Sequence, residues 1–142
     1  MSAPESRRIN IPATELLAPA SAPTWQPDPV AAELLAFLKT RLAEDRRIVD
    51  GVHSPVIQPR HQIGIGGGTT VLVPLHRFIA HLDAVEAVIV KYEAALSQVL
   101  RALEMGWPHG NAQVAAVAYL DALRVHALEY DTHLNYKEQW RP

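Results

Sequence analysis

Apolar residues recur at helical spacing in three stretches of the chain, and the first stretch lies between residues 29 and 49. Its apolar positions are Val30, Leu34, Phe37, Leu38 and Leu42. Charged residues occupy the opposite face, as expected of an amphipathic helix with one buried side. Asp28 and Pro29 are typical of a helix start, because aspartate caps free N–H groups and proline lacks an N–H at a position where none is needed. The pattern predicts a helix over 29–49.

The longest pattern runs from residue 75 to residue 105. Its apolar positions alternate at three and four residues and are Leu75, Phe78, Leu82, Val85, Ile89, Tyr92, Leu96, Val99 and Leu103. One unbroken helix here would be about 48 Å long, longer than a compact domain of this size is wide. We therefore expect it to protrude or to pack against a partner, with Leu96, Val99 and Leu103 in the interface. Alternatively, Asp83 caps a separate helix that begins at Ala84.

A third helix is predicted from about residue 111 to residue 130. Gly106, Trp107 and Pro108 form a glycine stop and a proline turn before it. The stretch is rich in alanine, and small side chains permit close approach between helices. The fold class is therefore mainly α, an antiparallel three-helix arrangement.

Between the first two helices the sequence becomes β-prone. Gly66, Gly67 and Gly68 separate the runs 62–65 and 70–73, as a turn separates two strands. We predict a small β-hairpin insert at about 56–73. Because a lone hairpin is marginal in water, it should pack on a helix or pair with a strand of another chain.

Proline dominates the chain before the first helix. Six of the eleven prolines lie within residues 1–29, a composition that favours extended backbone. We divide the chain into an extended arm, 1–27, and a helical domain, 28–142. Apolar residues in the arm, above all Trp25, are candidates for contact with a partner.

Composition removes several classes of function. The net charge of −2, with 20% charged residues, gives no electrostatic reason to expect nucleic acid or an anionic membrane. The chain has no cysteine, which excludes disulfides, thiolate zinc sites and a cysteine nucleophile. No apolar run approaches the roughly 20 residues that span a bilayer. We expect a cytoplasmic protein.

Histidine is the main source of candidate chemistry. The chain has seven, none of them four residues apart on one predicted helix, the spacing that metal sites favour. His76, His81 and Asp83 would converge with His126 or His133 if the helices packed side by side. We keep His76, His81, Asp83 and His133 as metal candidates, but expect no cofactor, because scattered histidines are more often structural.

Two further patterns have structural interpretations. The glycines at 66–68 lack the lysine and spacing of a phosphate-binding loop, so a hairpin turn is favoured. On a helical continuation after the third helix, Tyr130, His133, Tyr136 and Trp140 would share one face. They are predicted to form a structural clasp between the first and last helices. Base stacking is disfavoured because acidic residues lie among these rings.

Two segments resemble a family of small actinobacterial and actinophage proteins of unknown function. "LLAFLKTRLAEDRRI" is similar to the family's L-x-x-F-L-x-x-R-L-x-E-D helix, and "EYDTHLNYKEQWRP" to its Y-x-x-H-x-x-Y-x-x-x-W-R-P ending. "FIAHLDA" is similar to an H-I-A-x-H-D-P segment. Ala84 and Leu134 stand where the family has proline, which favours continuous helix at both. The resemblance implies a fold and a lineage but no activity.

Two hypotheses of different classes remain. The first is a non-enzymatic interaction or assembly protein, a homo-oligomer or a binder of another protein through the long helix and the arm. The family's occurrence in phage genomes leaves a virion component open. The alternative is a small histidine-rich metal-binding protein or metal-dependent enzyme.

Overall fold

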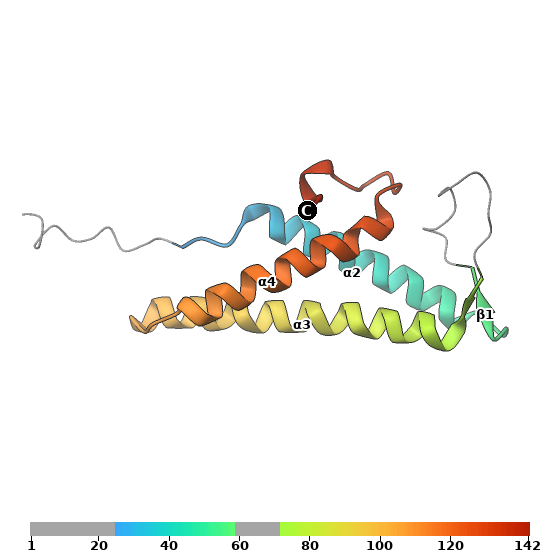
Figure 1. The fold of residues 1–142 in the computed structure, drawn as a ribbon, viewed down its shortest axis with the longest axis horizontal. Coiled ribbons are helices and arrows are strands. Elements are labelled where there is room, and N and C mark those ends of the chain that lie inside the picture. Colours follow the sequence, from blue (N-terminus) through green and yellow to red (C-terminus); the bar gives the residue numbers. More distant parts are fainter. Residues whose placement is uncertain (1–24, 59–71) are drawn as a thin grey trace, which may run out of the picture.

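The computed structural model describes residues 25–58 and 72–142. Three helices dominate this part of the chain, as predicted: α2 (Pro29–Asp50), α3 (Leu75–Met105) and α4 (Gly110–Ala127). Figure 1 shows α3 running the length of the molecule, with α2 and α4 on it. Most of the predicted arm, residues 1–24, lies outside the described residues.

Helix α2 begins and ends where the sequence predicts. The Oδ1 atom of Asp28 accepts a hydrogen bond of 3.0 Å from the backbone N–H of Val30, and Pro29 is the first helical residue. Asp28 thus satisfies one of the N–H groups that a helix start leaves unpaired.

Helix α3 is continuous, so the alternative of a break at Asp83 is not adopted. Asp83 instead accepts a hydrogen bond of 2.6 Å from Arg46 of α2. Lys39 of α2 pairs with Glu93 of α3. Because the earlier residue of α2 pairs with the later residue of α3, the two helices are antiparallel.

The β-hairpin consists of β1 (Val56–Ile57) and β2 (Val73–Pro74), which pair antiparallel with Ile57 opposite Val73. Ile57 is 5% exposed and belongs to the main core. The hairpin therefore packs on the helices, one of the two alternatives expected. The predicted glycine turn and the strand at 62–65 lie outside the described residues.

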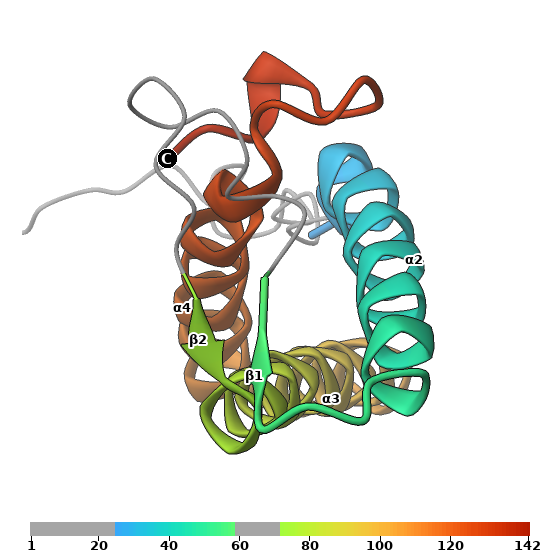
Figure 2. The same ribbon diagram turned by 90° about the vertical axis from the view of Figure 1, so that its right-hand side faces the viewer.

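The core fills the space between the three helices, which surround it in end view (Figure 2). Four leucines, Leu34, Leu38, Leu82 and Leu123, are fully buried and come from all three helices. Burying such a side chain contributes about 1.5–3 kcal/mol. All three helices therefore contribute fully buried side chains to one core.

The predicted exposure of the far end of α3 is wrong. Val99 is 0% exposed within a single chain, and Leu96 and Leu103 are half-buried. Helix α4 returns along this end of α3 (Figure 1), and Leu96 lines a groove with the first turns of α2. These three residues are therefore not exposed for contact with a partner. That the chain associates with a partner stays a prediction, but it no longer rests on them. Trp25, the arm's candidate, is half-buried.

The chain after α4 does not continue as a helix, so the predicted helical face does not form. It passes through the short 3₁₀ turns η2 (Leu128–Tyr130) and η3 (Glu138–Trp140), with irregular backbone at Leu134 between them. A straight helix would carry Trp140 about 15 Å beyond Tyr130. The bent path brings both rings to Phe37 of α2.

Candidate functional site

The structure does not bring the four predicted metal candidates together. His76 is exposed, and Asp83 binds Arg46. One ring nitrogen of His133 contacts Arg41, and the other accepts a hydrogen bond of 3.0 Å from the N–H of Asn135. Of the four, only His81 lies in a cluster of ligating side chains formed by residues that the structure describes.

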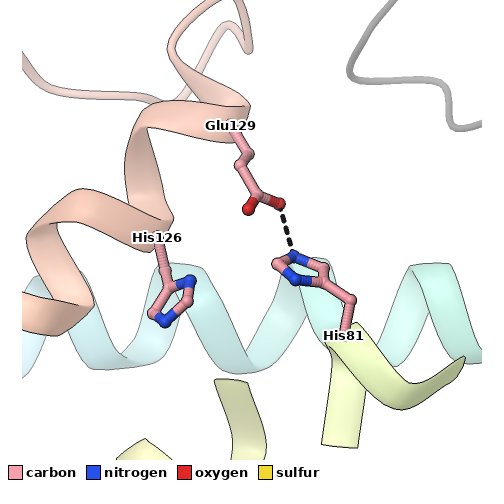
Figure 3. Close-up of side chains that lie close together, drawn as sticks. All are labelled: His81, His126 and Glu129. Carbon is pink, nitrogen blue, oxygen red and sulfur yellow. Dashed lines mark hydrogen bonds and ion pairs between the residues drawn. The ribbon is translucent and has the colours of Figure 1, made fainter. Parts of the chain in front are cut away.

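That cluster consists of His81, His126 and Glu129, and it is the one group of three His, Asp or Glu residues in the described chain whose ligand atoms lie within 4.8 Å of one another. His81 comes from α3, His126 from the last turn of α4, and Glu129 from η2. Figure 3 shows the two residues of the α4 end beside His81. The Nε2 atom of His81 is 2.7 Å from Oε2 of Glu129, and the two imidazole ring centroids are 5.8 Å apart.

The surroundings of this cluster favour neutral imidazole at His126. Burial lowers the pKa of His126 below its ordinary value, the Glu129 carboxylate partly offsets that effect, and His81 lowers the pKa further. Neutral imidazole is the form that binds metals. His81 and Glu129 have side chains 34% and 31% exposed, so a small ion can reach them from solvent.

Sequence reasoning named His126 as one of two histidines that could converge with His81, and it missed Glu129. His126 and Glu129 lie three residues apart, and three residues place two side chains on one face of a helical turn. The pattern His-x-x-Glu is a local signal that could have found this pair. Whether His81 lies beside this pair depends on how far α4 runs along α3. No local sequence pattern gives that distance.

A second polar group lies under the C-terminal segment. Tyr130 donates a hydrogen bond of 2.7 Å to Asp45, and Arg41 contacts both His133 and Glu44. Burial raises the pKa of the Tyr130 hydroxyl far above its usual range, and the Asp45 carboxylate raises it further.

The rings of the predicted clasp gather around Phe37 of α2. Trp140 is nearest, with ring centroids 4.9 Å apart. The other three rings have centroids between 5.7 and 6.2 Å from that of Phe37 and belong to Tyr130, His133 and Tyr136. Trp140 is only 2% exposed. Tyr130 and Trp140 therefore have the burial of core residues, whereas His133 and Tyr136 are half-buried.

A third feature is the α3–α4 tip, residues 98–117, where α3 turns into α4. Five of the ten exposed large hydrophobic side chains in the described residues lie here: Leu100, Met105, Trp107, Val114 and Val117. A hollow of about 720 Å³ lies beside Trp107. Helix α2 starts opposite Leu96, where Asp28 and Leu96 line a common groove. The tip therefore extends beyond the start of α2 (Figure 1).

In comparisons with known proteins, no family model matches the chain, and no match was found among curated proteins or solved structures. The resemblance of the two segments to the actinobacterial and actinophage family therefore stays a prediction. Within the described residues, each helix is too short or too polar to cross a lipid bilayer.

Proposed function

We propose that this chain is a non-enzymatic assembly protein that associates with a second copy of itself through the α3–α4 tip. The observation that carries the proposal is the gathering of exposed apolar side chains there, with Val114 70% and Val117 55% exposed. Apolar side chains grouped in this way on one part of a surface are typical of interaction sites.

A second copy fits the tip by shape and by charge. In a two-fold contact each copy offers the same surface, so Trp107, which lines the hollow and is 50% exposed, can contact the hollow of the other copy. The tip carries one arginine, Arg101, and one glutamate, Glu104. Two tips therefore do not repel each other, and the charges can pair reciprocally. The similarity of the chain's two segments to actinobacterial and actinophage proteins supports a bacterial or phage assembly, including a virion component.

Light scattering and sedimentation equilibrium at micromolar concentrations test the proposal. The wild-type chain should be a dimer, and the double variant Val114→Lys, Val117→Lys should be a monomer with an unchanged helical circular-dichroism spectrum. Val125→Lys is the matched control, because Val125 is on the same helix and 55% exposed but lies outside the tip.

A wild-type monomer would contradict the proposal. A dimer that survives the double variant, or one that Val125→Lys disrupts equally, would place the contact elsewhere. If the tip is instead covered by residues 1–24 of the same chain, the wild type is a monomer that dimerises only when those residues are removed.

A further inference from the structure

We infer that His81, His126 and Glu129 form a binding site for a divalent transition-metal ion of the zinc class. Two imidazoles and one carboxylate make a donor set that zinc prefers. The inference is independent of the tip, because the cluster joins the beginning of α3 to the end of α4 whereas the tip joins their other ends.

The separations of the ligand atoms suit an ion. Zinc binds imidazole nitrogen and carboxylate oxygen at about 2.0–2.2 Å, so the ligand atoms of a tetrahedral site are about 3.3 Å apart. Here His81 and Glu129 are 2.7 Å apart, and no pair in the cluster exceeds 4.8 Å. The three side chains already lie beside one another (Figure 3), so we expect side-chain rotations to close the site.

A hydrogen-bonded pair explains two members of the cluster but not the third. The contact between His81 and Glu129 needs no second histidine, yet His126 lies beside it with its ring centroid 5.8 Å from that of His81. A metal ion accounts for all three. It would lie between His81 Nε2 and Glu129 in place of their hydrogen bond, with His81 bound as the neutral ring whose proton is on Nδ1.

Three protein ligands leave the fourth tetrahedral position to water, an arrangement found in catalytic more than in structural zinc sites. The ion would also hold the end of α4 and η2 against α3. Metal binding should therefore stabilise the fold, because an ion that binds the folded chain and not the unfolded one shifts the equilibrium toward folding.

Titration of the untagged, chelator-treated chain with Co²⁺, followed by competition with Zn²⁺, tests the inference. One equivalent of Co²⁺ should give the strong visible absorption of a four-coordinate site, and Zn²⁺ should remove it. The variants His81→Gln, His126→Gln and Glu129→Gln should each weaken binding by at least about 100-fold, because each removes a direct ligand. His76→Gln is the control, since His76 is an exposed histidine on the same helix.

A wild-type chain that binds neither ion at micromolar concentration overturns the inference, as does binding that His76→Gln weakens as much as the ligand variants. If a variant fails to fold, X-ray absorption of the zinc-loaded wild type decides. Two imidazole ligands per zinc support the site, and none or one overturns it.

Discussion

The hydroxyl of Tyr130 donates a hydrogen bond of 2.7 Å to Oδ2 of Asp45, and so joins η2, which follows α4, to the last turns of α2. Asp45 is 6% exposed and Tyr130 5%. The same two stretches meet twice more, where Arg41 contacts His133 and where Phe37 contacts Trp140. Residues on which the family resemblance rests thus contact one another in the fold.

Tyr130→Phe should lower the free energy of unfolding by about 1–3 kcal/mol, because it removes a hydrogen bond from a buried carboxylate. Urea denaturation measures the change. Tyr119→Phe, a half-buried tyrosine on α4 outside the clasp, is the control and should have little effect. Equal stability of Tyr130→Phe and the wild type would mean that the bond contributes nothing net.

Alkaline pH should destabilise the wild type more than Tyr130→Phe. The folded state raises the pKa of Tyr130, by burial first and by Asp45 second. Below about pH 10, the ordinary tyrosine pKa, both states keep the proton and the contribution is fully present. Above that pH only the unfolded state loses the Tyr130 proton, so the free energy of unfolding falls by about 1.4 kcal/mol per pH unit. The free energy of unfolding, measured by urea denaturation at a series of pH values from neutral to alkaline, should show this extra fall with pH only in the wild type. Parallel slopes would refute it.

Trp140→Ala should be the most damaging change in the C-terminal segment. The indole is 2% exposed and packs on Phe37, and removing a packed tryptophan costs about 3–5 kcal/mol. Tyr136→Ala should cost less, because Tyr136 is only half-buried. Thermal unfolding measures both, with Leu134→Ala as the control at a side chain 95% exposed. A normal melting temperature for Trp140→Ala would make this surface a binding site instead of a core.

The helices could be predicted because their signals are local. Asp28 caps a helix that starts at the next residue, and Gly106 ends a helix that stops at the residue before it. The spacing of apolar residues along 75–105 identifies a buried face without any knowledge of what covers it. For that reason the same pattern did not reveal that Val99 is buried within a single chain.

The bent path after Tyr130 and the helix register that sets His81 beside His126 and Glu129 could not be predicted, because both depend on contacts between distant parts of the chain. Trp140 turns back to reach Phe37, more than a hundred residues earlier. His81 meets His126 only because α3 and α4 are antiparallel and in one particular register. Neither partner is visible in the sequence around the other.

Deleting residues 1–24 should leave the helical domain folded. The core of the described residues comes from the three helices, the hairpin and the clasp, all of which lie after residue 24. We expect the melting temperature of the shortened chain to stay close to that of the full chain. A fall of more than about 8 °C, which corresponds to a loss of roughly 2 kcal/mol, would show that these residues belong to the core.

Gly106→Ala should destabilise the chain by about 1 kcal/mol, because Gly106 ends α3 with a φ of 67°, a conformation that alanine adopts only with strain. Gly110→Ala is a matched control at the start of α4. A Cβ atom at either glycine meets nothing within 4 Å. A difference in stability between the two substitutions therefore comes from the backbone conformation and not from a steric clash. Urea denaturation should show a loss at 106 and little change at 110. Because Gly106 sets the direction in which the chain leaves α3, Gly106→Ala should also weaken the proposed dimer. Equal effects of the two substitutions would contradict this account of the turn.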